Sequence, residues 1–221
     1  MKFLIAYARS SIGQKQLMGL TGLLWCGFLV GHLSGNFALL ASAEAFNKYA
    51  HFLTSLGGLL YIMEAGLVIT FLSHAFLGIR VSMQNKKARE TNYIKGSDKG
   101  GSHMAARLMA LSGAVTLIFV VLHLIQFKFG KVYMVPGTEI RDLYKTVMEL
   151  YANPFFTLWY VIAMVLLGIH LTHALHSSLQ SLGLNHPKYT PAILGISKFF
   201  GSVVAGGFIV ISILAHLKGG A

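Results

Sequence analysis

Ten histidines occur in this chain, and six of them fall inside long apolar segments, where a polar side chain is costly. These six are His32, His74, His123, His170, His173 and His176. A neutral imidazole is a common metal ligand and also a carrier of protons. The histidines therefore direct attention to three kinds of chemistry: haem-based electron transfer, metal transport and proton transport.

A single cysteine, Cys26, narrows the metal chemistry. It excludes an intrachain disulfide, a Cys-ligated iron–sulfur cluster, a C-x-x-C-H haem attachment and a Cys-based zinc site. We therefore expect any metal in this chain to be held mainly by histidine.

The elements that position these histidines are predicted from composition. The chain has 221 residues, of which 55% are hydrophobic and 11% charged, and its mean hydropathy is +0.64. These values predict one all-α transmembrane domain over residues 1–221. The first apolar run is too long for a signal peptide, so we expect it to be retained as a helix. The expected spans are about 16–40, 57–81, 104–127, 154–180 and 199–217, with Pro191 in the loop before the last.

Basic residues predict the orientation of these spans. Twelve of the 18 lysines and arginines fall on one side of the membrane and six on the other. The richer side holds the N-terminus and the loop 84–101, so we expect both in the cytoplasm and the C-terminus outside. The loop is either a docking surface or merely solvated. Because the charges lie between apolar runs, topology explains them better than binding to nucleic acid does.

The histidines can then be given depths. His32, His74, His123 and the trio in the fourth span each lie about two-thirds of the way along their spans. Since successive spans run in opposite directions, His32 and His123 should share an outer level, and His74 and one of the trio an inner level. The two levels would be roughly 15 Å apart. Two histidine pairs at two depths suit two stacked haems b within the first four helices, with Gly27, Gly31 and Gly35 allowing close packing.

Two other interpretations use the same residues. A lone membrane histidine more often forms a hydrogen bond between helices than a metal site, but four at matched depths favour ligands. A metal or proton transporter would gather its ligands with carboxylates at one midplane site, whereas here only Glu64 lies well inside a span. In the fourth span His173 matches the depth of His74 best, with His170 and His176 as alternatives one turn away on either side.

Several motifs carry a resemblance to a known family. They are SIGQK at 11–15 with Met18 and Thr21-Gly22, HLSGN at 32–36, FNKYAHF at 46–52, HAFLGIR at 74–80 with QNKKAR at 84–89, and HLTHA at 170–174 with QSLG at 180–183. In this order they resemble the single-subunit, dihaem, b558-type cytochrome b membrane anchor of succinate:quinone oxidoreductases, the succinate dehydrogenases and fumarate reductases. The resemblance covers nearly the whole chain.

This resemblance implies a five-helix anchor with two haems b in the bacterial cytoplasmic membrane. Position by position, His32 and His123 would hold the distal haem and His74 and His173 the proximal one. His173 is chosen because the H-L-x-H-G pattern of the family uses its second histidine; here Ala174 replaces the usual glycine. Some fumarate-reducing relatives have a glutamate where this chain has Leu171, so we do not expect their proton path.

The resemblance also implies that the chain is a subunit of a respiratory chain and has partners there. A flavoprotein with FAD and an iron–sulfur subunit would bind on the cytoplasmic side, and electrons from succinate would pass through the clusters and both haems to a quinone, expected to be menaquinone. The nearest alternative is the dihaem anchor of a formate dehydrogenase or a hydrogenase. Candidate quinone-site residues near the outer level are His51, Glu64, Gln126 and Lys128. Candidate partners of the haem propionates are Arg141 and Lys145 outside and Arg80 and Arg107 inside.

Overall fold

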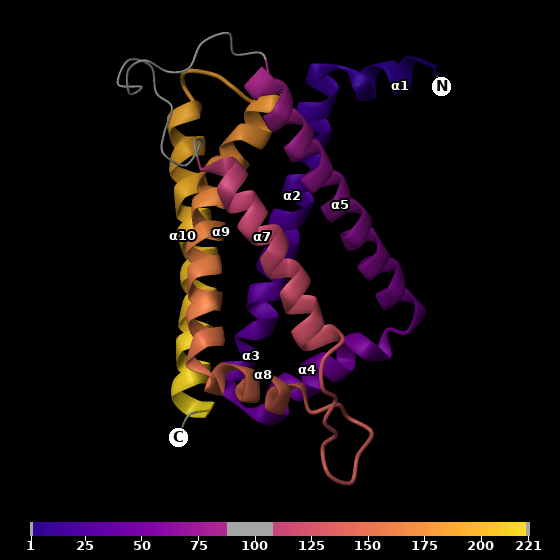
Figure 1. The fold of residues 1–221 in the computed structure, drawn as a ribbon, viewed down its shortest axis with the longest axis vertical. Coiled ribbons are helices and arrows are strands. Elements are labelled where there is room, and N and C mark those ends of the chain that lie inside the picture. Colours follow the sequence, from indigo (N-terminus) through magenta and orange to yellow (C-terminus); the bar gives the residue numbers. More distant parts are fainter. Residues whose placement is uncertain (1, 88–107, 220–221) are drawn as a thin grey trace.

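Five long helices form the body of the protein in a computed structural model that describes residues 2–87 and 108–219 (Figure 1). Each is long and apolar enough to cross a membrane. They are α2 (Ser11–Asn36), α5 (Gly58–Lys87), α7 (Met109–His123), α9 (Pro154–Ser181) and α10 (Thr190–Gly219). For the described residues, the prediction of an all-helical protein is confirmed, and so is the prediction of five helices long and apolar enough to cross a membrane.

The helix ends differ from the predicted spans in several places. Helix α2 begins earlier than expected, at Ser11, and α5 continues past the expected end at residue 81 to Lys87. The last helix begins at Thr190, nine residues earlier than expected, because Pro191 lies in its first turn, where a missing N–H costs nothing. The first span is interrupted at Phe37, after which α3 (Ala38–Ala41) follows. The third ends in a π-helix, η1 (Leu124–Lys128), and its expected start at residues 104–107 lies outside the described residues.

Short helices lie across the two ends of the bundle. In Figure 1, α1 (Lys2–Arg9) lies at one end, and α3, α4 (Ala43–Ser55) and α8 (Leu143–Ala152) lie at the other. We call these the α1 end and the α8 end. The sequence analysis did not predict α1, α4 or α8, which it treated as connections between spans.

The short helices α3, α4 and α8 form a cap over the α8 end. Capping residues begin α4 and α8, and burial of their apolar faces holds them against the bundle. Ser42 accepts a hydrogen bond from the Ala45 amide at the start of α4, and Asp142 does the same for Lys145 at the start of α8. One face of each short helix is apolar and buried against the ends of α2, α9 and α10. This core comprises Leu33, Leu39, Phe46, Val147, Tyr151, Tyr160, Ile211 and Ala215.

Polar contacts tie the cap together. The side chain of Asn47, which is 5% exposed, donates to Asp142 Oδ1 at 2.9 Å and accepts from the Tyr144 amide at 2.9 Å. His216 near the end of α10 contacts the main-chain oxygen of Tyr151 through its Nδ1 at 2.7 Å. These bonds join α4, α8 and α10 where the chain leaves the membrane-spanning segment.

Packing between the long helices is uneven. The pair α9 and α10 is in closest contact, since a Cβ on Gly168 would lie 2.8 Å from the Cβ of Ala205. Small residues at such a crossing let two helix backbones approach, as is common in membranes. Helix α2 packs against α5 and α9, and α7 packs against α9. In Figure 1, α5 leans away from α2 toward the α8 end.

Candidate functional site

Near the α8 end, two histidine rings from different helices face one another. The ring centroids of His32 on α2 and His123 on α7 are 5.8 Å apart, and their planes are almost perpendicular at 87°. Aromatic side chains hold both rings: Phe28 stacks on His32 at 5.2 Å, and Phe127 meets His123 edge-on at 5.0 Å. We call His32 and His123 the α8-end pair.

Two successive hydrogen bonds orient His123. Its Nδ1 lies 3.3 Å from the hydroxyl of Tyr160 on α9, and that hydroxyl donates to Gln126 Oε1 at 2.6 Å. A phenol has one proton, so once it is given to Gln126 the oxygen can only accept from His123. His123 therefore carries its proton on Nδ1, and its Nε2 keeps a lone pair that a metal could bind.

A second pair of rings meets near the α1 end. The centroids of His74 on α5 and His170 on α9 are 6.4 Å apart, with an interplanar angle of 70°. The Nδ1 of His74 lies 3.0 Å from the carbonyl oxygen of Met18. Because a carbonyl can only accept, this ring is also protonated on Nδ1. We call His74 and His170 the α1-end pair.

The other member of the α1-end pair is held in the same way. The Nδ1 of His170 lies 3.2 Å from Ser112 Oγ on α7. That hydroxyl already donates its proton within α7, to the carbonyl of Leu108 at 2.8 Å, so it accepts from His170. Ser112 is fully buried, which leaves the serine hydroxyl little freedom to bond elsewhere.

The ring separation in both pairs matches the separation expected for two imidazoles on one haem iron. Two imidazoles on opposite sides of one metal ion, each bonded at about 2 Å, have ring centroids roughly 6 Å apart. Metal-bound histidines almost always donate their other ring N–H to a protein acceptor, as His74, His123 and His170 do here. The eleven-residue advance along α7 from Ser112 to His123 places the two levels about 16 Å apart, from a rise of about 1.5 Å per residue.

Ring contacts bring together members of the two expected histidine pairs. His32 and His123 come together as expected, and so do His74 and one of the three candidates on α9. That candidate is His170, whose ring contacts His74, whereas the sequence analysis favoured His173, three residues further along. The assignment of His173 stays a prediction, and the ring geometry supports the alternative of His170.

Glycines face both rings of the α1-end pair. A Cβ on Gly22 of α2 would lie 3.0 Å from His74 Cε1, and one on Gly113 of α7 would lie 3.5 Å from His170 Cε1. Near the α8-end pair, Gly35 packs against the ring of Tyr49. Among the described residues, a Cβ on Gly27 or Gly31 would meet no atom of another part of the protein within 4 Å, so these two glycines leave space along α2.

The candidate propionate partners lie in different settings. Arg141 Nη2 donates to the Phe127 carbonyl at 2.8 Å, while its Nε is buried without a hydrogen-bond partner among the described residues. Such an orphaned guanidinium N–H near the α8-end pair suits a carboxylate. Lys145 lies over the Tyr133 ring at 4.6 Å, Arg80 is exposed on α5, and Arg107 lies outside the described residues.

The candidate quinone-site residues are partly brought together. Glu64 on α5 forms an ion pair with Lys128 at the end of η1, which joins two helices on the same level as the cap. Gln126 turns toward Tyr160, and His51 is exposed on α4. The carboxylate and ammonium are the two members of this set that the structure places in contact.

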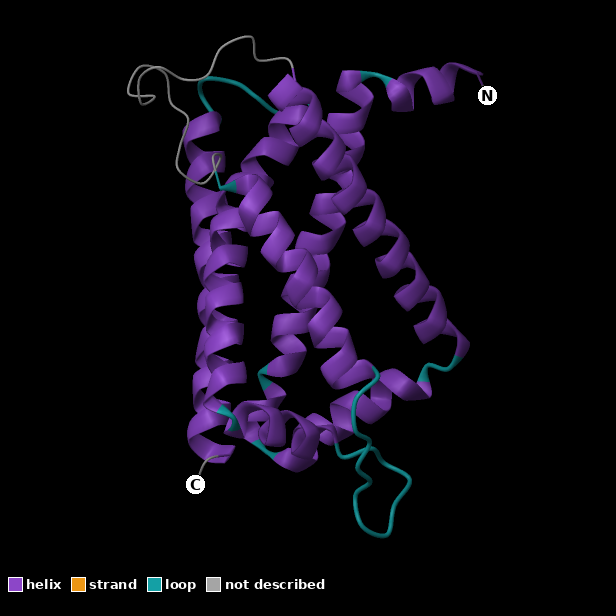
Figure 2. Ribbon diagram, viewed as in Figure 1, coloured by secondary structure: helices purple, strands orange, loops and turns teal. Residues whose placement is uncertain are grey.

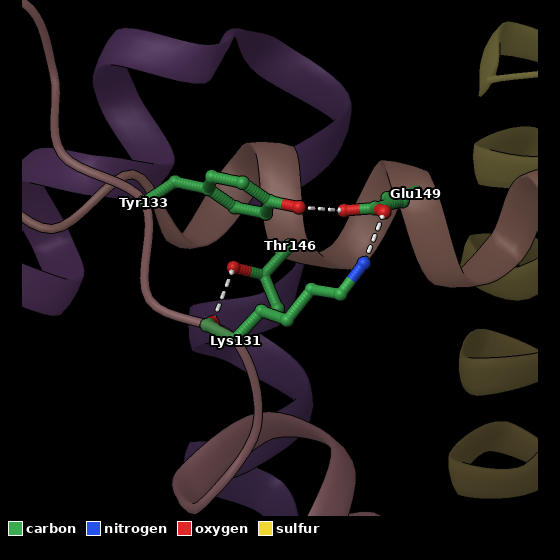
Figure 3. A network of polar contacts seen from close by, with 4 residues as sticks. All are labelled: Lys131, Tyr133, Thr146 and Glu149. Carbon is green, nitrogen blue, oxygen red and sulfur yellow. Dashed lines mark hydrogen bonds and ion pairs between the residues drawn. The ribbon is translucent and has the colours of Figure 1, made fainter.

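The loop 129–142 between η1 and α8 (Figure 2) is fixed to the cap by a polar network (Figure 3). Figure 3 shows Glu149 of α8 bonded to both Tyr133 and Lys131 of the loop, with Lys131 Nζ at 3.0 Å. The hydrogen bonds from Tyr133 and then Lys131 lower the pKa of the Glu149 carboxyl. The bond with Glu149 in turn raises the pKa of Lys131.

Sequence reasoning missed the residues that orient the histidines. Tyr160 and Ser112 accept from His123 and His170, and the Met18 carbonyl accepts from His74, whose Nδ1 also lies 3.3 Å from Thr21 Oγ1. A tyrosine or serine within an apolar span needs a hydrogen-bond partner, which is a signal, but the sequence does not say which partner. Comparisons with protein-family models, with curated proteins and with solved structures find no match to this chain.

Proposed function

We propose that this chain is a dihaem cytochrome b membrane anchor and electron conduit of a succinate:quinone oxidoreductase. The observation that supports the proposal is that four histidines form two ring contacts, His32 with His123 and His74 with His170. The motif resemblance over nearly the whole chain supplies the choice of partner enzyme.

The four histidines would act as axial ligands, two to each haem. In His123, His74 and His170, the Nδ1–H bonds to Tyr160, Met18 and Ser112 would leave Nε2 for the metal and fix the plane of the ring before a ligand arrives. When bound, the two haems b supply one-electron transfer between an iron–sulfur partner and quinone. The sequence-based assignment of His173 is replaced in this proposal by His170, and His173 becomes its matched control.

Other residues of the chain would act at the two ends of the proposed electron path. Arg141 offers its unpartnered Nε to a propionate at the α8 end. The ion pair of Glu64 and Lys128 supplies a proton acceptor and a donor at the level where quinone would be reduced. We propose, from the distribution of basic residues, that the α1 end faces the cytoplasm and binds the flavoprotein and iron–sulfur subunits.

The proposal is tested on the complex in anaerobic native membranes that contain the tagged chain. We expect succinate to develop the absorption bands of a reduced b-type cytochrome, and we expect flavin and iron–sulfur polypeptides to purify with the chain. A His74→Ala variant is the control for bands that come from another cytochrome, because it should lose part of the signal.

Experiments on the same membranes distinguish the proposed function from its nearest alternative. Reduction by formate or by hydrogen, with no response to succinate, would contradict the assignment to a succinate enzyme and favour the anchor of a formate dehydrogenase or hydrogenase. A purified chain that carries zinc or no metal would contradict a cytochrome of either class.

A further inference from the structure

The acceptors of the ring N–H groups differ between the two histidine pairs, and this difference has a functional consequence. Near the α1 end, His74 donates to a main-chain carbonyl, which no side-chain substitution can remove, and His170 donates to the buried hydroxyl of Ser112. Near the α8 end, His123 donates to the hydroxyl of Tyr160, a side chain from another helix. The electronic state of His123 therefore depends on one phenol.

We infer that Tyr160 is the positioning residue that sets the reduction potential of the haem at the α8 end, an inference that rests on the proposed dihaem function. Its hydroxyl lies 3.3 Å from His123 Nδ1 and donates to Gln126 Oε1 at 2.6 Å. Giving the proton to Gln126 leaves the phenol oxygen richer in electrons and so a better acceptor. Tyr160 acts on the metal only through His123.

The surroundings of Tyr160 hold its hydroxyl in this place. The residue is 3% exposed and its ring packs edge-on against Phe119 at 5.0 Å and Tyr151 at 5.1 Å. Gln126, the acceptor, lies in the π-helix η1, and short π-helical turns are common at functional sites. The hydroxyl therefore lies between two fixed groups.

The direction of the effect follows from ligand basicity. An imidazole that donates its N–H to an acceptor becomes a stronger electron donor to the metal, which stabilises the oxidised iron and lowers the potential. Removing the acceptor weakens that donation. Loss of the Tyr160 hydroxyl should therefore raise the potential of the α8-end haem and leave the α1-end haem unchanged.

The test is a redox titration of the complex in membranes, with Tyr160→Phe compared with the unchanged protein. The α8-end haem is identified as the one lost in His123→Ala. We expect two haems to remain and the equilibrium of that haem to move about tenfold toward the reduced form, or about 60 mV for one electron. Gln126→Leu should move it in the same direction by less, since the hydroxyl remains.

Tyr151→Phe is the matched control. This neighbouring tyrosine is also buried and packs against Tyr160, but its hydroxyl accepts from Ser212 at 3.1 Å. It should shift neither potential. The inference would be overturned by unchanged potentials in Tyr160→Phe or by an equal shift in Tyr151→Phe. If Tyr160→Phe does not assemble, the absence of a shift in Gln126→Leu would overturn it instead. An unchanged protein without haem would instead contradict the proposed function.

Discussion

The two histidine pairs use similar ring distances but are built differently. The α8-end pair lies among aromatic rings beneath a cap of short helices, and its polar support comes from Tyr160 and Gln126. The α1-end pair has a main-chain carbonyl and a buried serine as supports, with glycines opposite the rings. Both levels thus rely on a side-chain hydroxyl, but only the α1-end level also relies on a main-chain carbonyl and on glycines opposite the rings.

This difference would matter for the proposed electron conduit. Two sites with equal ligands would have similar potentials unless their surroundings differ, because the second shell, burial and nearby charge tune an iron centre. In this chain the two histidine pairs are surrounded by different kinds of groups. Four predictions test this contrast, from the largest expected effect to the smallest.

The largest effect is expected for His170. Replacing His170 by Ala removes one of the two rings of the α1-end pair, so one haem of two should be lost, as counted by pyridine haemochromogen absorbance. His173→Ala, one turn further along the same helix, should keep both haems. The reverse result would restore the sequence-based choice of His173 and contradict the pairing by ring geometry.

A smaller effect is expected from closing the space beside His74. Gly22→Ala places a methyl group 3.0 Å from His74 Cε1, so the ring must shift away from its present position. We expect retention of the α1-end haem to weaken about tenfold, measured as haem loss to apomyoglobin. Gly66→Ala, where a Cβ meets no protein atom within 4 Å, is the control on the same helix as His74. Equal haem loss in both variants would indicate a general effect of alanine instead.

Substitutions in the cap should change the stability of the protein more than they change the haem potentials. Asn47→Leu removes two hydrogen bonds between α4 and α8 and leaves the Tyr144 amide without its acceptor, which should cost about 1–3 kcal/mol. The midpoint of thermal unfolding in detergent should fall, while the α1-end potential stays constant. Lys48→Ala is the neighbouring control, since its ion pair with Glu44 is fully in solvent. If Lys48→Ala lowered the midpoint as much, the buried amide would not be the cause.

The smallest effect is expected in the loop 129–142. Glu149 has a lowered pKa in the folded protein, so its stabilising contacts are fully present above its unfolded value of about 4.3 and are lost as pH falls through the folded value. Because these groups face solvent, Glu149→Gln should only increase cleavage of the loop by protease at neutral pH. The difference from the unchanged protein should shrink in acid. A difference that persists at low pH would mean that charge is not what holds the loop.

The sequence predicted the main helices because hydrophobic length is a strong signal. The fourth span was placed within one residue, from Asn153 and Pro154 at its start. The short helices α4 and α8 were missed because their apolar faces are only two to three turns long and are buried against residues distant in sequence. Pro191 was interpreted as part of a loop, although proline also begins helices, as it does in α10.

The histidine levels were predictable for a similar reason, and the exact ligand was not. Depth along a helix follows from counting residues, which brought His32 to the level of His123. The choice between His170 and His173 depends instead on how α9 is rotated against α5, and the two side chains differ by about 60° around the helix axis. That rotation is set by packing between α9 and its neighbours, which a single sequence does not reveal.

The most direct test of the two-site arrangement is the haem count of the purified chain and three variants. The unchanged protein should contain two haems b, His123→Ala and His74→Ala should each contain one, and the double variant should contain none. The haem that remains should differ in potential between the two single variants. An unchanged protein without haem, or single variants that both keep two, would contradict the account.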